Sequence, residues 1–454
     1  MIFFLQDNDW NGSCDLSSSP EVIEKLLPFA GIPLSRLQEQ NPGLLVFPDK
    51  LGKYGDNWSN EVLFDLRGGR IATGNVVGFF GIGSLQFQIG SRFDEKDSPQ
   101  YFLHYMLSRA FGMNMVNMPT SSDSEPIWDF LFYLFVYYQK RALRQGIFRT
   151  YRTFERNDDH VRGAIDIPRH LRLNMPFRGT VAYRTREYSA NNPLIHLIRH
   201  TIEAIRTNPR ASGLLNVDDE IRSDVRTIME LTPDYSRHDR SKVIAKNLRP
   251  MRHPYFTEYA GLQTICLKIL RHERISYGQS EDQLNGIVFK AEWLWEEYLA
   301  SVLKDCGILH AQNNLGRHPF SIYRDRVSPF VYPDFFSANL VMDAKYKQAG
   351  NEIQRDDRFQ LISYLHIRKA SAGILIYPCN EIAETGIQYE DGERGILNGF
   401  GGSIGFIRFA VPKGASSFSD FQGRIKKSEK RLRTLVREQN DQLDQSPVAA
   451  GNAN

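Results

Sequence analysis

The order of secondary-structure patterns after about residue 291 constrains the fold more than any other feature of the sequence. AEWLWEEYLASVLKD has helical periodicity, SPFVYPDFF and NLVMDAKYK have the character of strands, DDRFQLISYLHIR is again helical, and AGILIYP is a strand. Helices that alternate with strands are typical of a mixed sheet flanked by helices. The sequence therefore predicts an α/β domain over residues 286–425.

The rest of the chain divides into three further ranges. Residues 1–125 mix short apolar runs with turn residues, as in NVVGFFGIGSLQFQIGSRF, which predicts a β-rich N-terminal domain. Residues 126–285 contain the apolar segment IWDFLFYLFVYYQ and the amphipathic segment PLIHLIRHTIEAI, which predict a mainly helical region with a β insertion. Residues 426–454 are expected to form an exposed basic helix and a disordered tail. A multi-domain α/β protein follows, because 454 residues exceed one ordinary core.

Several classes of protein are disfavoured by the sequence. The longest apolar run is interrupted by Asp129 and falls short of the roughly 20 residues that a bilayer requires. The N-terminus has no basic region before its apolar run, so we expect a cytoplasmic protein with no membrane partner. The four cysteines show no C-x-x-C spacing, so neither a disulfide framework nor a zinc site is predicted.

Charged residues interrupt two of the predicted strands. Asp334 follows Pro333 at the end of the first strand, and Asp343 and Lys345 share one face of the second, because side chains alternate along a strand. The connection around residues 337–339 is short enough to bring the strands side by side, so the three charges should converge. Two buried carboxylates are costly without a cation between them, and Mg²⁺ is the natural candidate. Lys345 could then orient water or neutralise charge in a phosphodiesterase.

The predicted helices on either side of these strands add further polar residues. Glu296 lies on the same helical stripe as Leu299 and Leu303, which makes it an inward-facing carboxylate and a candidate metal-site acid. On the following helix, Asp357 fits the positive N-terminus and needs no catalytic role, and Gln360 is interpreted mainly as a surface amide.

Arginine is concentrated in one part of the middle region. Between Arg141 and Arg186 there are eleven arginines, no lysine and four acidic residues. Arginine suits bidentate contacts with phosphate or carboxylate. A solvated basic face, or an interface with an acidic partner, is an equally good interpretation.

The segments LWEEYL, YPDFF, MDAKYK and DDRFQLISYL, in this order, resemble the PD-(D/E)xK nuclease domain of the McrC family, the cleavage subunit of McrBC-type restriction systems. GFFGIGSLQFQIGSRF, VRGAIDIP and NNPLIHLIRHTIEAI resemble regions that precede it in that family, so the resemblance spans most of residues 75–410. Where the family leads us to expect Pro-Lys after the N-terminal strands, this chain has Gly90, Ser91, Arg92 and Phe93.

The resemblance implies a set of functional residues and partners. It makes Asp334 and Asp343 the metal-binding acids, with the main-chain carbonyl of Ala344 as a further ligand, Lys345 the catalytic lysine and Glu296 the helical acid. It implies a Mg²⁺-dependent endonuclease, in which Mn²⁺ can replace Mg²⁺, acting on double-stranded DNA. It also implies an oligomeric McrB-like AAA+ GTPase as partner, which this chain stimulates and engages through its N-terminal region. No G-x-x-x-x-G-K-[ST] motif occurs, so nucleotide hydrolysis is expected from another chain.

Two alternatives stay open at this stage. One is a non-catalytic adapter that regulates a partner NTPase, which an incomplete set of acids and lysine would favour. The other is a stand-alone DNA repair nuclease, which would cleave without a nucleotide. The recognition sequence, the methylation requirement and the stoichiometry are not encoded in any motif that we identify.

Overall fold

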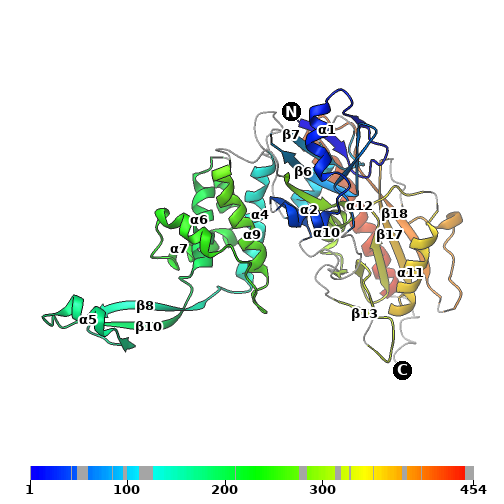
Figure 1. Ribbon diagram of the computed structural model, residues 1–454. Coiled ribbons are helices and arrows are strands. Elements are labelled where there is room, and N and C mark those ends of the chain that lie inside the picture. The colour runs from blue at the N-terminus through cyan, green and yellow to red at the C-terminus, as the bar shows by residue number, and fades with distance from the viewer. Residues whose placement is uncertain are drawn as a thin grey trace. The chain divides into compact units, whose positions relative to one another are not determined.

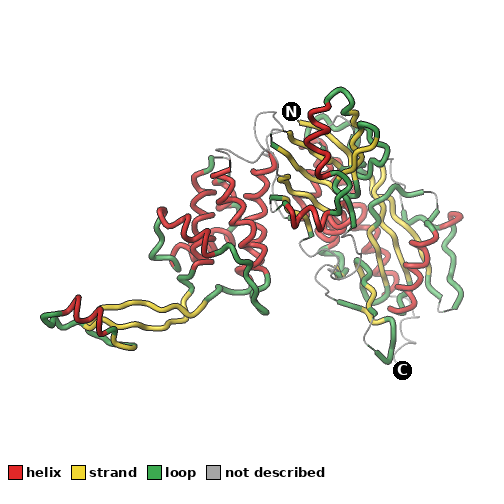
Figure 2. The backbone as a smooth tube through the Cα atoms, viewed as in Figure 1, coloured by secondary structure: helices red, strands yellow, loops and turns green. Residues whose placement is uncertain are grey.

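The computed structural model describes residues 2–41, 43–48, 60–83, 85–95, 100–111, 126–209, 211–275, 284–311, 318–326, 329–350, 352–380, 386–399 and 401–444. The chain forms two compact units, the first from Met1–Ser122 with Ser280–Asn454 and the second from Asp123–Gln279 (Figure 1). The predicted N-terminal and C-terminal ranges therefore belong to one unit. Its sheets and helices are distinguished by colour in Figure 2.

A five-stranded sheet forms the N-terminal part of the first unit. Its strand order is β1-β7-β6-β11-β3, with β1 at Ile2–Gln6, β3 at Leu44–Phe47, β6 at Val76–Ile82, β7 at Leu85–Gly90 and β11 at Leu284–Lys290. Strand β11 pairs antiparallel with β6 and parallel with β3, although it follows them by some two hundred residues. A Cβ on Gly78 would lie 2.3 Å from the Ile287 carbonyl oxygen, so this close pairing requires glycine.

Smaller elements cover this sheet. They are the helices α1 (Pro20–Leu26) and α2 (Leu34–Gln40) and a second sheet of β2 (Cys14–Asp15), β5 (Arg70–Thr73) and β4 (Phe64–Arg67). Apolar residues such as Leu26, Phe64 and Phe80 are fully buried between them. Burial of apolar surface is the main force that holds these layers together.

Three helices join the N-terminal sheet to the C-terminal one: α3 (Tyr101–Ala110), α10 (Ala291–Leu303) and α12 (Phe418–Asp444). Glu429 of α12 is buried and accepts hydrogen bonds from the hydroxyls of Tyr105 (2.9 Å) and Tyr298 (3.1 Å), one from each of the other helices. The basic helix predicted after residue 425 is thus the larger part of α12. It is not exposed all round, because one of its faces is buried. The predicted tail, residues 445–454, lies outside the described part of the chain.

The C-terminal sheet has the order β12-β15-β16-β17-β18. Its strands are β12 (Leu309–His310), β15 (Phe335–Phe336), β16 (Leu340–Ala344), β17 (Ala372–Cys379) and β18 (Ser403–Ala410), and helix α11 (Arg355–Arg368) packs on it through residues such as Leu361. Strands β16, β17 and β18 are parallel, whereas β12, β15 and β16 pair antiparallel. The predicted α/β class, with a mixed sheet flanked by helices, is confirmed.

The strand predicted as SPFVYPDFF is wrong in one respect. It consists of two short strands in different sheets, β14 (Phe330–Val331), which pairs with β13 (Phe320–Ser321), and β15. Pro333 lies between them, and proline has no N–H with which to continue a ladder. Asp334 consequently stands at the start of β15 rather than at the end of the preceding strand.

The second unit is a helical body with a β arm. The helices are α4 (Pro126–Arg144), α6 (Pro193–Thr207), α7 (Asp219–Glu230), α8 (Arg240–Lys246) and α9 (Glu258–Ile275). The arm consists of β8 (Thr150–Asp158), β9 (Ala164–Ile165), α5 (Ile167–Asn174) and β10 (Val181–Ser189), and Figure 1 shows β8 and β10 running away from these helices. The arm is the predicted β insertion. Within the described residues, no helix is apolar over a length that could cross a bilayer.

Candidate active site

The two predicted acids, Asp334 and Asp343, are held together by the pairing of β15 with β16. The strands are antiparallel with Phe335 opposite Met342, and a connection of three residues joins them. Oδ2 of Asp334 accepts a hydrogen bond of 2.7 Å from the main-chain N–H of Ala344. Both carboxylates are buried, with exposures of 9% and 3%. Along a strand, the N–H and C=O of one residue point to the same edge, so the Ala344 carbonyl also faces the side of Asp334.

Lys345 lies against the acid pair. Its Nζ is 2.5 Å from Oδ2 of Asp343 and 3.8 Å from Oδ1 of Asp357. Burial alone would lower the pKa of Lys345, but the neighbouring carboxylates, Asp343 first, raise the pKa above its usual value. Lys345 is therefore a permanent cation at neutral pH, suited to donating hydrogen bonds and neutralising charge rather than to accepting a proton.

The electrostatics around Asp334 are unfavourable in the absence of a bound cation. Burial raises the pKa of Asp334 well above its usual value, and the negative charges of Asp343 and Glu296 raise it further. The Ala344 N–H and Lys345 lower the pKa without compensating fully. A divalent cation at this position would offset the repulsion.

Glu296 occupies the inward face of α10, where its side chain is 12% exposed. Its Oε1 lies 2.7 Å from Nε2 of His310 on β12. Burial lowers the pKa of His310, so the ring is neutral at pH 7 and its Nε2–H donates to the carboxylate. The structure thus brings Glu296 close enough to influence Asp334 and holds it through a histidine that the sequence analysis did not single out.

Two residues of α11, Asp357 and Gln360, lie next to Lys345. Gln360 is exposed, as its interpretation as a surface amide predicts. Oε1 of Gln360 accepts a hydrogen bond of 2.7 Å from Lys345, and Asp357 is buried, 2.6 Å from Nζ of Lys347. The hydroxyl of Tyr377 also donates to Asp357, across 3.0 Å. Asp357 lies in the first turn of α11, as predicted, but it is also buried and paired with Lys347. Positions 357, 360 and 364 share one helical face, which is the signal that could have identified them.

A cavity of about 690 Å³ opens over these residues. Its lining carries six carboxylates (Glu61, Glu292, Glu296, Asp334, Asp343 and Asp357) and four cations (Arg92, Lys290, Lys345 and Lys347). The surplus of negative charge favours a cation as the first ligand of the cavity rather than a bare phosphate.

The donor set fits a hard divalent ion. In the described part of the chain, no group of three or more His, Cys, Asp or Glu side chains is arranged to hold a metal. The candidate site offers two carboxylates, Asp334 and Asp343, and the Ala344 carbonyl. Mg²⁺ commonly binds through one or two carboxylates and completes its shell with water and substrate phosphate. The residues present therefore suit Mg²⁺ better than a metal that needs a full protein cage.

Among the solved structures that this chain resembles are two complexes from Thermococcus gammatolerans. One is the refined half-complex from a tetradecameric assembly of Thermococcus gammatolerans McrB AAA+ hexamers with bound McrC, with 16% identity, a TM-score of 0.49, and coverage of 96% of this chain and 100% of that chain. The other is the cryo-EM structure of the Thermococcus gammatolerans McrBC complex, with 15% identity, a TM-score of 0.32, and coverage of 67% and 88%. No curated protein matches the sequence.

The family comparison is more decisive. The model of the McrBC 5-methylcytosine restriction system component matches residues 71–378, about two thirds of the chain. This match includes the N-terminal strands β6 and β7, the second unit and the acid pair, and it confirms the resemblance predicted from the sequence. The chain belongs to the family of McrBC 5-methylcytosine restriction system components.

Proposed function

We propose that this chain is the endonuclease subunit of a McrBC-type restriction system and hydrolyses DNA phosphodiester bonds with Mg²⁺. The observation that carries the proposal is the convergence of Asp334, Asp343 and Lys345 in one buried, negatively charged cavity. A complete acid-acid-lysine set favours a nuclease over a non-catalytic adapter.

The residues divide the chemistry between them. Asp334, Asp343 and the Ala344 carbonyl would hold Mg²⁺, which supplies a Lewis acid and a water of lowered pKa when bound. Lys345, kept protonated by Asp343, donates to the attacking water or to the non-bridging phosphate oxygens as their negative charge grows. Gln360 accepts from Lys345 and so fixes the direction of its ammonium group. His310 fixes the carboxylate of Glu296, the third acid near Asp334, through a hydrogen bond.

The test is DNA cleavage by the full chain together with its McrB-type AAA+ GTPase, in the presence of GTP and Mg²⁺. We expect Asp343→Asn and Lys345→Ala to abolish cleavage while GTPase stimulation persists. Asp356→Asn and Lys304→Ala are matched controls, because both side chains are exposed and neither lines the cavity. Cleavage retained by Asp343→Asn would contradict the assignment, and cleavage without a nucleotide or partner would favour a stand-alone nuclease.

We further propose that the chain stimulates an AAA+ GTPase and that the β arm of the second unit contributes to this contact. Large apolar side chains are exposed along the arm, including Ile167 (63%), Met175 (63%) and Phe177 (65%). Such a patch is typical of a protein interface. The sequence analysis placed the contact in residues 1–125, and this stays a prediction.

The arginines of the same region support a protein contact over a simple phosphate-binding surface. Arg156 pairs with Glu187 (3.0 Å) and Arg184 with Asp166 (2.9 Å) inside the arm. On the helical body, Arg141 and Arg144 are paired with Glu258 and Glu220. Part of the local positive charge is therefore already neutralised.

Replacing both Met175 and Phe177 with serine tests the arm. We expect weaker partner binding and weaker GTPase stimulation, with Leu248→Ser as the control, because Leu248 is also an exposed apolar side chain (50%) but lies outside the arm. Unchanged partner binding by the double variant would contradict a role of the arm and would favour a contact with the GTPase through residues 1–125.

A further inference from the structure

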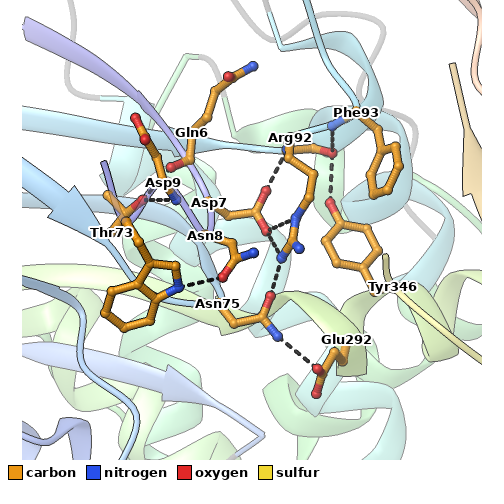
Figure 3. Close-up of polar contacts among 12 residues, drawn as sticks. Gln6, Asp7, Asn8, Asp9, Thr73, Asn75, Arg92, Phe93, Glu292 and Tyr346 are labelled. Atoms are coloured by element: carbon orange, nitrogen blue, oxygen red, sulfur yellow. Dashed lines mark hydrogen bonds and ion pairs between the residues drawn. The ribbon is translucent and has the colours of Figure 1, made fainter. Parts of the chain in front are cut away.

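Tyr346 follows Lys345 directly and is held by three consecutive residues that come immediately after strand β7. Its hydroxyl lies 2.7 Å from Oγ of Ser91, and its ring meets that of Phe93 edge to face at 5.2 Å between centroids. The guanidinium carbon of Arg92 lies 5.1 Å from the centre of the same ring. Figure 3 shows Arg92 and Phe93 beside Tyr346. Tyr346 is 4% exposed, so the contact is part of the core.

Arg92 is the centre of this arrangement. Its Nε and Nη2 donate to Oδ2 of Asp7 at 2.8 and 2.5 Å, and its main-chain N–H donates to the other oxygen of the same carboxylate. The Asp7 side chain is completely buried at the end of β1, so its charge depends on this partner. A guanidinium that donates two hydrogen bonds to one carboxylate oxygen, with an aromatic ring against it, has little freedom to rotate.

The network also reaches the helix that carries Glu296. Nη2 of Arg92 donates to Oδ1 of Asn75, and Nδ2 of Asn75 donates to Oε1 of Glu292 across 2.8 Å (Figure 3). Glu292 lies in the first turn of α10, and the main-chain N–H of Ala291 donates to the Asn75 carbonyl at 3.1 Å. Arg92 therefore touches the segment that follows β16 directly, and touches the start of α10 through Asn75.

We propose that Arg92 is a positioning residue for the cleavage centre, an inference that rests on the proposed nuclease function. It fixes Tyr346, and through the chain Lys345 and Ala344, relative to the start of α10. Groups that fix the residues which touch metal and substrate contribute to catalysis because small displacements of the reacting groups are costly. Ser91, Arg92 and Phe93 share this role, because each of them contacts Tyr346.

The test compares Arg92→Lys with the matched variant Arg199→Lys. Arg199, in the second unit, is also largely buried, pairs with Glu203 at 2.8 Å and lies over the ring of Tyr235 at 4.6 Å, but it does not line the cavity. Lysine keeps the charge but cannot form the fork to Asp7 or cover the tyrosine ring. In single-turnover cleavage by the full chain with its partner, we expect Arg92→Lys to be about tenfold slower, with DNA affinity within twofold, and Arg199→Lys to match the wild type.

Two readouts do not depend on cleavage. The Mn²⁺ affinity of the full chain, measured by calorimetry, should fall in Arg92→Lys and stay unchanged in Arg199→Lys. Hydrogen exchange of the amides of residues 344–347 should become faster in Arg92→Lys alone. A structural role confined to the N-terminal sheet would lower the melting temperature without moving either quantity.

A milder pair of variants protects the test against misfolding. Ser91→Ala and Tyr346→Phe each remove the same hydrogen bond, so each should slow cleavage, and the double variant should be no slower than the slower single variant. Wild-type rates and wild-type Mn²⁺ affinity in Arg92→Lys would overturn the proposal even where Asp343→Asn is inactive. If the wild type does not cleave, the proposed function fails, whereas the Mn²⁺ titration still decides the role of Arg92.

Discussion

The main-chain N–H of Ala344 donates a hydrogen bond to the Asp334 carboxylate across 2.7 Å, which ties the first acid of the site to the strand that carries the second. The bond partly offsets the cost of burying Asp334 beside Asp343. It does not remove that cost, because the pKa of Asp334 stays well above its usual value. The site therefore stores an unfavourable interaction that a bound cation can relieve.

Asp334→Asn should stabilise the metal-free protein while it abolishes cleavage. The folded state disfavours the ionised form of Asp334, so the folded protein loses stability as the pH rises above the pKa that this carboxyl has in the unfolded chain. Asparagine carries no charge, yet its side-chain oxygen can still accept the hydrogen bond from the Ala344 N–H. We expect a melting temperature higher by about 2 °C or more at pH 8 with a chelator present. A clear fall in melting temperature would contradict the proposed repulsion.

Gln360→Ala should slow cleavage by about tenfold, because Lys345 loses the acceptor that directs its ammonium group. The matched control is Gln354→Ala at the N-cap of the same helix, which removes an equivalent 2.7 Å bond from Lys347. Single-turnover rates measure both. Equal effects of the two variants would show that Gln360 has no special relation to Lys345.

Asp94 should make the stability of the first unit depend on pH. Its carboxylate accepts from the N–H groups of Phe102 (2.8 Å) and Leu103 (3.1 Å) at the start of α3, but burial raises the pKa of Asp94 to about 7. The unfolded chain ionises near 3.8, so the folded state binds more protons between these values and the free energy of unfolding falls as pH rises through them. Between pH 5 and pH 8, the free energy of unfolding in urea should fall less for Asp94→Asn than for the wild type. An equal fall in both proteins would show that Asp94 does not cause the pH dependence.

Asn192→Ala should destabilise the second unit by about 1 kcal/mol or more. The Asn192 side chain accepts from the N–H groups of Leu194 and Ile195 at the start of α6 and also donates to the Phe148 carbonyl across 3.1 Å. Asn192→Asp retains the acceptor and should recover part of the loss. Denaturant unfolding measures both, and an alanine variant as stable as the wild type would contradict this capping role.

The acid pair was predictable from local sequence because two local rules determine it. Side-chain alternation put Asp343 and Lys345 on one strand face, and the short connection after Phe336 forced the strands to pair. The break at Pro333 was readable in principle, since proline cannot continue the ladder.

The remaining parts of the site depend on contacts between segments far apart in the sequence. Pairing of β11 with β6, which sets the start of α10, joins residues some two hundred positions apart, and no local pattern specifies it. Burial of Asp357 depends on how α11 packs on the sheet. The contact of Arg92 with Tyr346 joins the turn after β7 to the segment after β16, which are some 250 residues apart, so the periodicity of neither segment could predict it.

The measurement that tests the central claim most directly is Mg²⁺-dependent cleavage of DNA by the full chain with its GTPase partner, compared between the wild type and Asp343→Asn. We predict cleavage by the wild type, no cleavage by the variant, and wild-type GTPase stimulation in both. Cleavage at the wild-type rate by Asp343→Asn would contradict the proposed centre at Asp334, Asp343 and Lys345.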